Sequence, residues 1–202
     1  MGNQGIRQSG GNSVEKKIFG ALEKISHVLR FLAWKKATEL ALTPIQLQIL
    51  IYLLRGSPER GKVGLLAREF NISKASISDT IRLMVDKKLV EKSFNGTGGR
   101  DFIIELTPMG VEMANKAAQM DAEILNAITR ILPAGRTSLF SRLGEILLDL
   151  QRAAVMPVQR MCQTCHHYST MDNKHFCGLL ERSMRPAQLQ LDCPEHQMSA
   201  RP

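Results

Sequence analysis

Apolar residues recur at helical spacing through most of the chain. From Val14 they step by four, four, three, four and three residues, a pattern that predicts a long amphipathic helix to about Ala37. A second apolar run follows Thr43-Pro44, a pair typical of a helix N-cap and the first helical residue. Two more helices are predicted at residues 108–132 and 134–155, so the chain reads as mainly α.

Two short helices joined by a tight turn are predicted inside this helical frame. The first covers residues 62–70, Asn71-Ile72 forms the break, and Ser73 is the predicted N-cap of a helix that runs to about Lys88. The inward positions of this helix are apolar, whereas its outward first turns carry small, polar and basic side chains. This arrangement predicts a helix-turn-helix.

A change of pattern after this helix predicts a β-hairpin. Residues 89–94 and 102–106 can each form a strand, and the glycine-rich segment 95–99 between them is a turn. Lys92 and Arg100 lie on the two arms. The predicted fold class is therefore mainly α with a two-stranded β-wing, a winged helix-turn-helix.

Four stretches in a fixed order carry a family resemblance. They are Leu42-Thr43-Pro44 with Leu47 and Leu50, Leu66-Ala67-Arg68 with 72–78, Leu89–Lys92, and Arg100 with 106–110. Together they resemble the MarR family of bacterial transcription regulators over residues 14–155. The resemblance implies a homodimer built from the N- and C-terminal helices, with each recognition helix in a major groove of double-stranded DNA and each wing near the adjacent minor groove.

The resemblance also implies roles for single residues. Ser73 would cap the recognition helix, and Arg100 matches the wing arginine of the family. The other candidate DNA-binding residues are Lys74, Ser76, Ser78, Arg82 and, on the wing, Lys92. Cationic side chains neutralise phosphates, and hydroxyls at a helix N-terminus bond to phosphates or base edges.

Three positions depart from the family pattern. Gly98 stands where an acidic residue often precedes the wing arginine, and Lys88 replaces a common turn glycine. Asp79 stands where a basic or neutral residue is usual, and a carboxylate near phosphates is unfavourable unless Arg82 or Lys74 pairs with it.

Charge and composition agree with a nucleic-acid partner. The chain has 202 residues and a net charge of +8, and the residues before 156 carry +7 of it. A basic surplus suits a polyanion, with nucleic acid as the first candidate and an anionic membrane surface as the second. No apolar run approaches the length of a membrane span, and residues 1–13 read as a disordered arm. We therefore expect a cytoplasmic protein with no membrane partner.

All four cysteines lie in a separate tail, residues 156–202. They are Cys162, Cys165, Cys177 and Cys193, and the first two form a C-x2-C pair. A module this short rarely folds stably without a bound metal ion or a disulfide. Four thiolates suit Zn²⁺, which is the preferred ion, or an iron–sulfur cluster. A thiol–disulfide switch and inert thiols are the alternatives. Four histidines are possible substitute ligands, or else exposed groups or hydrogen-bond partners beside the site: His166, His167, His175 and His196.

These patterns predict a DNA-binding transcription regulator. The family resemblance favours a repressor on a palindromic operator, controlled by a small-molecule or redox effector, with a structural or sensory cysteine site. One alternative is a winged-helix module that is stabilised by zinc and binds another protein. The other is a regulator that senses redox state through its thiols. We expect no enzyme, because the C-x2-C pair lacks the βαβ setting of thiol–disulfide oxidoreductases.

Overall fold

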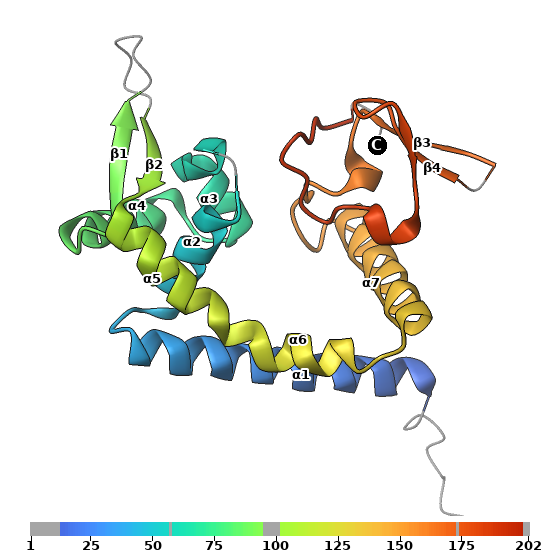
Figure 1. Ribbon diagram of the computed structural model, residues 1–202, viewed down its shortest axis with the longest axis horizontal. Helices are drawn as coiled ribbons and strands as arrows, with labels where there is room; N and C mark the ends of the chain where they lie inside the picture. Colours follow the sequence, from blue (N-terminus) through green and yellow to red (C-terminus); the bar gives the residue numbers. More distant parts are fainter. Residues whose placement is uncertain (1–12, 57, 95–101, 173, 200–202) are drawn as a thin grey trace, which may run out of the picture.

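The computed structural model describes residues 13–56, 58–94, 102–172 and 174–199 (Figure 1). A long first helix, α1 (Val14–Glu39), lies along one side of the molecule, and α6 (Ala122–Thr129) runs beside it. A winged domain and a C-terminal module both stand on the same side of this pair. The fold thus places two separate bodies on one helical base.

The winged domain follows the predicted order. It consists of α2 (Pro44–Leu54), the 3₁₀ turn η1 (Pro58–Gly61), α3 (Val63–Glu69), α4 (Lys74–Asp86), the strands β1 (Val90–Phe94) and β2 (Phe102–Leu106), and α5 (Pro108–Ala118). The strands pair antiparallel, with Val90 opposite Leu106 and Phe94 opposite Phe102. The fold class is therefore a winged helix-turn-helix, as predicted.

One apolar core holds the elements of this domain together. Ile49 and Leu50 of α2, Leu66 of α3 and Ile77 of α4 are all fully buried. Each such side chain contributes about 1.5–3 kcal/mol through removal of its surface from water. The inward face of α4 is thus committed to the core, which fixes its opposite face toward solvent.

Gly110 lets α5 approach the start of the wing. A Cβ at this position would lie 1.8 Å from the carbonyl oxygen of Leu89. Any larger residue would push α5 away from the end of α4 and the start of β1. This is a physical reason for glycine in the stretch 106–110 noted above.

The prediction of one helix over 108–132 is wrong. The helix α5 ends at Ala118, and the 3₁₀ turn η2 (Gln119–Asp121) separates it from α6. The break coincides with a tertiary contact, because Asp121 accepts a hydrogen bond of 2.7 Å from Arg55. The last long helix, α7 (Pro133–Arg152), follows and leads into the C-terminal module.

The C-terminal module is a small body with little apolar core. It contains η3 (Cys162–Thr164), β3 (Tyr168–Met171), β4 (Lys174–Cys177), β5 (Arg182–Met184) and η4 (Pro186–Gln188), and its sheet has the order β3-β4-β5. Cys162, Met184 and Leu189 are buried together, with Phe140 of α7 packed against them. The module is thereby seated on the end of α7.

No single helix in the described ranges is both long and apolar enough to cross a bilayer, although α1 and α2 pass that test jointly as a pair bent by 95°.

Candidate functional site

The turn between α3 and α4 is set by Asn71. Its φ is 52°, a left-handed conformation that asparagine tolerates better than most residues. The N–H of Ile72 donates to the carbonyl of Ala67 at 3.0 Å, which closes the end of α3 in a Schellman motif. The chain can then reverse within two residues, and α4 starts at once.

The start of α4 carries a set of hydroxyl groups held by local hydrogen bonds. Ser73 Oγ accepts from the backbone N–H of Ser76 at 3.1 Å, which confirms Ser73 as the N-cap. Ser78 Oγ donates to the carbonyl of Lys74 at 2.8 Å. All four residues are exposed. They form a preorganised polar surface, and their contact with DNA stays a prediction.

Arg82 and Asp79 form an ion pair on the same helix. The two side chains are 73% and 69% exposed, and Arg82 Nη2 lies 3.3 Å from Asp79 Oδ1. A pair this exposed contributes little to stability. Its main effect is electrostatic, because Asp79 cancels part of the positive charge on the exposed face of α4.

The wing contributes one described cation. Lys92 on β1 is exposed, and its Nζ lies 4.7 Å from the centroid of the Phe102 ring on β2. This cation–π contact holds the ammonium against the hairpin. Arg100 and Gly98 lie outside the described residues, so the predicted wing arginine is not placed.

Two lysines after α4 have structural roles. Lys87 Nζ donates to the carbonyl of Ala41 at 2.8 Å. Lys88 has a φ of 58°, and Leu89 N–H donates to the carbonyl of Met84 at 3.0 Å. This is a second Schellman motif, and it explains why a glycine would be favoured at position 88.

The four cysteines line one cavity in the C-terminal module. Its volume is about 20 Å³, and Cys162, Cys165, Cys177 and Cys193 all contribute to its wall. Cys162 begins η3, Cys165 directly follows it, Cys177 ends β4, and Cys193 lies in a later loop. All four are free thiols. Within the described ranges, no three histidine, cysteine or acidic side chains already stand in an arrangement that could hold a metal ion.

The surroundings of the cavity shift the pKa of two of the thiols that line it. Burial raises the pKa of Cys162 above its ordinary value, a hydrogen bond from the Gln190 N–H to Cys162 Sγ (3.2 Å) opposes this, and the other three cysteines add to it. Burial likewise raises the pKa of Cys193, and a hydrogen bond from the Glu195 backbone opposes it. Backbone donors therefore already point at two of the sulfurs.

The four nearby histidines separate into two groups. His167 also lines the cavity, and its Nε2 is buried without a hydrogen-bond partner among the described residues. His175 Nδ1 lies 2.6 Å from the Tyr168 hydroxyl, and His196 Nε2 lies 2.9 Å from Thr164 Oγ1. His166 is exposed. Only His167, of these four, faces the thiols.

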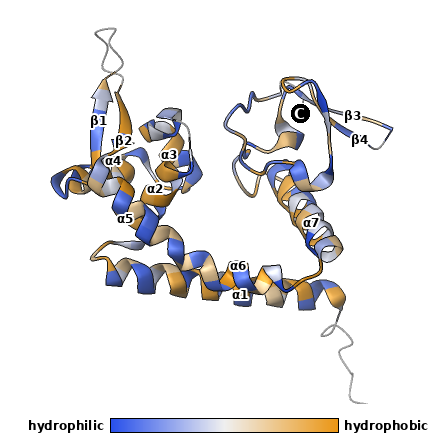
Figure 2. Cartoon of the chain, in the orientation of Figure 1, coloured by the Kyte–Doolittle hydropathy of each residue, from blue (hydrophilic) through white to orange (hydrophobic). Residues whose placement is uncertain are grey.

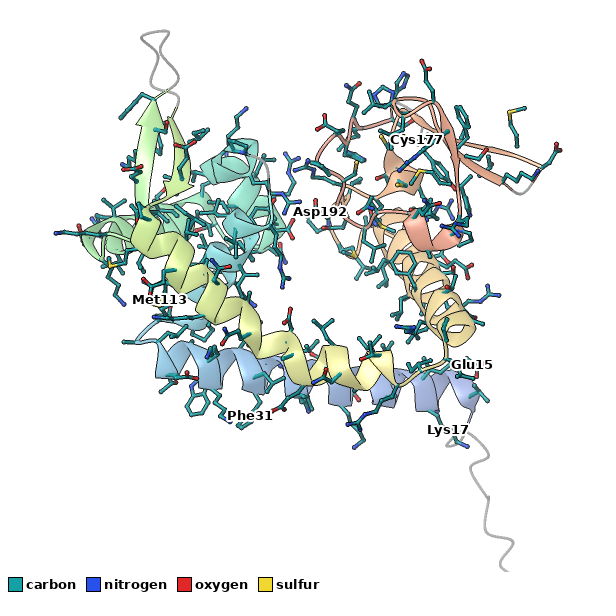
Figure 3. The ribbon with its side chains drawn as sticks, in the orientation of Figure 1. Glu15, Lys17, Phe31, Met113, Cys177 and Asp192 are labelled. Atoms are coloured by element: carbon teal, nitrogen blue, oxygen red, sulfur yellow. The ribbon has the colours of Figure 1, made fainter. Side chains whose placement is uncertain are left out.

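A buried arginine joins the two bodies of the molecule. Arg60 of η1 is 5% exposed, and its Nη2 lies 2.5 Å from Asp192 Oδ2 in the C-terminal module. Its guanidinium also lies over the Tyr52 ring, 4.8 Å from the centroid. In Figure 3, Asp192 projects from the module toward the winged domain. No pattern in the sequence around Arg60 or Asp192 predicts this contact.

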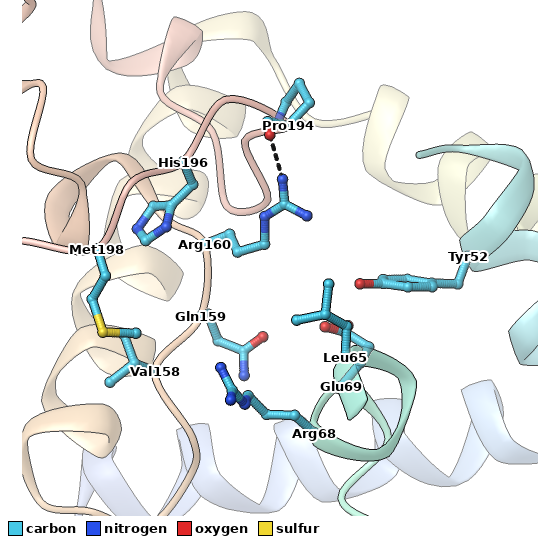
Figure 4. Close-up of a pocket in the computed structure, with 10 residues that line it drawn as sticks. All are labelled: Tyr52, Leu65, Arg68, Glu69, Val158, Gln159, Arg160, Pro194, His196 and Met198. Carbon is cyan, nitrogen blue, oxygen red and sulfur yellow. Dashed lines mark hydrogen bonds between the residues drawn. The ribbon is translucent and has the colours of Figure 1, made fainter. Parts of the chain in front are cut away.

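A cleft of about 240 Å³ opens beside this contact (Figure 4). Tyr52, Leu65, Arg68 and Glu69 form one wall, and the C-terminal module forms the other. Burial raises the pKa of Glu69, and the nearby Asp192 raises it further, whereas Arg60 and Arg160 lower it. The cleft therefore places a perturbed carboxylate, Glu69, at the boundary between the two bodies.

The comparisons with known proteins agree with this fold. The MarR family model matches residues 42–101, which cover the helix-turn-helix and reach the wing. The search of curated proteins gives no significant match. Among solved structures, Staphylococcus aureus MepR in its DNA-binding conformation superposes with a TM-score of 0.58 and 19% identity, covering 66% of this chain and 98% of its own.

Two further structures give the same result. The S. aureus MepR–DNA complex has a TM-score of 0.56 and 19% identity over 69% of this chain and all of its own. RV1404 from Mycobacterium tuberculosis has a TM-score of 0.52 and 20% identity over 69% of this chain and 95% of its own. The chain thus shares the fold of these proteins, and its residues 42–101 match the MarR family.

Proposed function

We propose that this chain is a DNA-binding transcription regulator of the MarR type. The observation that carries the proposal is the two-sided character of α4. Its inner face, with Ile77, Ile81 and Met84, is buried in the core, while its outer face presents Lys74, Ser76 and Arg82 to solvent. A MepR structure with the same fold is described as a complex with DNA, which supports this use of the surface.

The geometry suits a helix in the major groove with a wing beside it. Lys74 and Arg82 would neutralise phosphates, Ser76 and Ser78 would bond to phosphates or base edges, and Lys92 would approach the neighbouring groove. Phosphate contacts fix orientation, and base contacts select the sequence. The predicted Arg100 completes this set from the wing.

The apolar surface of α1 supports a homodimer. Ile18, Ile25 and Leu29 lie on one stripe of the helix and are 50%, 48% and 42% exposed. Figure 2 shows apolar residues along both α1 and α6. Contiguous exposed apolar surface of this kind marks an interface. A two-fold dimer would read a palindromic operator, and bound at a promoter it would act as a repressor.

An effector would act by changing the spacing of the two recognition helices. A cavity of about 390 Å³ is lined by residues of α2 and η2, among them Ile51, Tyr52 and Met120, and by Arg60 and Asp192. It lies where the winged domain meets the helical base, so a ligand bound there could shift one relative to the other. This cavity is our candidate effector site.

The direct test is selection of duplex DNA from a randomised library by the full chain. We expect enrichment of an inverted repeat whose half-sites lie about one helical turn apart. The variant Lys74→Ala/Arg82→Ala should lose the enrichment, whereas Lys174→Ala, on β4 of the C-terminal module, should keep it. Absence of enrichment by the wild-type chain at low salt would contradict the proposal and favour a winged helix that binds protein.

A further inference from the structure

We propose that four cysteines hold a single Zn²⁺ ion: Cys162, Cys165, Cys177 and Cys193. We further propose that this ion fixes the loop that contains Asp192, the residue that forms an ion pair with Arg60 of the winged domain. The ion would thereby join the C-terminal module to the body of the protein. The proposal goes beyond DNA binding and does not depend on it.

The first argument is convergence. The thiols come from a 3₁₀ turn, the end of a strand and a loop, and they span 32 positions of sequence, yet all line one cavity. The C-x2-C pair is closed by a hydrogen bond from Cys165 N–H to the Cys162 carbonyl (3.0 Å). Backbone N–H groups that donate to sulfur stabilise the thiolate form that metals bind.

The second argument is size, which selects one ion over a cluster. A cavity of about 20 Å³ has room for one sphere the size of a water molecule. A single tetrahedral Zn²⁺ fits such a space, with Zn–S bonds of about 2.3 Å. A four-iron cluster with its sulfides is larger than this space. Binding would turn the four thiol side chains inward and release their four protons to solvent.

The third argument is what the module lacks without an ion. Its buried apolar side chains among the described residues are Met161, Cys162, Met184 and Leu189, too few for a stable core. Moreover, His167 lines the same cavity, and its Nε2 is buried with no partner in the described ranges. A metal centre supplies the missing stabilisation, and the thiolates beside His167 supply an acceptor for its N–H.

The fourth argument is the direct connection from the cysteines to the winged domain. Asp192 precedes Cys193 in the chain, and Cys193 N–H donates to the Arg160 carbonyl at 2.8 Å. The Arg160 guanidinium in turn donates to the Pro194 carbonyl at 2.5 Å (Figure 4). The loop around Cys193 is therefore held on both sides, so fixing its sulfur fixes Asp192.

The contact made by Asp192 is of a kind whose loss has a large effect. Arg60 is almost fully buried, and an arginine in that position without its carboxylate would be an uncompensated charge. Arg60 belongs to η1, whose last residue Gly61 abuts the backbone of Ile104 in β2. Release of Asp192 would thus loosen η1 and the strand that continues into the wing.

Metal analysis of the full chain, purified without oxygen and with reductant, tests the site. We expect about one zinc per chain and, after replacement by Co²⁺, the intense charge-transfer absorption of cobalt–thiolate bonds. Cys177→Ser should lose the metal, whereas His166→Ala, which changes an exposed neighbour, should retain it. Wild-type protein without metal, or with iron and acid-labile sulfide, would overturn the proposal even if the variants did not fold.

Hydrogen exchange tests the connection, with no DNA present. Chelation of zinc from the wild-type protein should accelerate exchange in residues 58–61 at least about tenfold. Asp192→Asn should show the same acceleration while keeping its zinc, and chelation should then add nothing at this segment. Asp172→Asn, the same change elsewhere in the module, should behave as wild type. If the exchange rate of residues 58–61 did not change when zinc was removed, the proposed link between the zinc site and the winged domain would be wrong.

Discussion

Asp79 lies on the exposed face of α4 beside the predicted phosphate contacts and pairs with Arg82. Asp79→Asn frees Arg82 and removes a charge that repels phosphate. We expect operator binding to strengthen by up to about 1 kcal/mol, roughly fivefold in Kd, and the gain to shrink at high salt. Fluorescence anisotropy on the selected duplex measures it.

Asp149→Asn is the matched control for this change. Asp149 forms the same exposed i,i+3 pair with Arg152, at 3.2 Å, but on α7. It should leave the affinity unchanged. If Asp79→Asn has no more effect than this control, then α4 does not face the phosphates.

Lys88 adopts a left-handed conformation that costs a side chain about 1 kcal/mol or more relative to glycine. Lys88→Gly should raise the free energy of unfolding by about 0.5–1 kcal/mol, since the relief of strain exceeds the added entropy of the unfolded chain. Urea denaturation measures this value.

The neighbouring change should have the opposite sign. Lys87→Gly loses the hydrogen bond to the Ala41 carbonyl at a residue with an ordinary right-handed φ of −79°. It should lower the free energy of unfolding by about 1 kcal/mol. If Lys88→Gly and Lys87→Gly changed the free energy of unfolding equally, the left-handed turn at Lys88 would carry no strain.

At the scale of elements, α1 carries the proposed dimer interface. Ile25→Glu places a charge in its apolar stripe, where two-fold symmetry would bury it twice. We expect the Kd of the dimer to rise at least about 100-fold, because each unpaired buried charge costs several kcal/mol. Sedimentation equilibrium measures this Kd.

His27→Glu provides the comparison on the same helix. His27 is exposed, and two residues along a helix turn the side chain by about 200° to the opposite face. The dimer should survive this change. Similar dissociation by both variants would place the interface elsewhere.

The elements that the sequence predicted well are those with local signals. The Thr43 and Ser73 caps and the period of apolar residues predict the start of α2 and both ends of α1 and α4 to within about two residues. Caps and periodicity act over about one helical turn, so they can be read locally. The break at 119–121 was missed because the apolar period continues through it. At this break Asp121 accepts a hydrogen bond from Arg55, which is distant in sequence, and no local pattern predicts such a contact.

In the whole molecule, too, the sequence predicts features with a local pattern but not contacts between residues that are distant in the chain. The C-x2-C pair and the absence of cysteine elsewhere predicted that four thiols belong together, and the structure brings them to one cavity. Arg60 and Asp192 are 132 residues apart, and neither carries a local signature. A charged residue in a loop reads as solvated until the tertiary structure buries it.

The arrangement of the whole molecule also separates its two proposed tasks. The face of α4 lies on the winged domain, and the thiol cavity lies in the C-terminal module, outside the residues matched by the MarR family. The Arg60–Asp192 contact is an ion pair that links these two bodies. Zinc binding and DNA binding can therefore be measured independently and then tested for coupling.

The salt dependence of DNA binding tests the central claim most directly. On the selected duplex, the slope of log Kobs against log salt concentration should be strongly negative for the wild-type chain. For Lys74→Ala it should be smaller in magnitude by about two, one for each subunit of the dimer. Lys174→Ala, on β4 of the C-terminal module, should match the wild type. An unchanged slope for Lys74→Ala, or wild-type binding that is insensitive to salt, would contradict DNA recognition by α4.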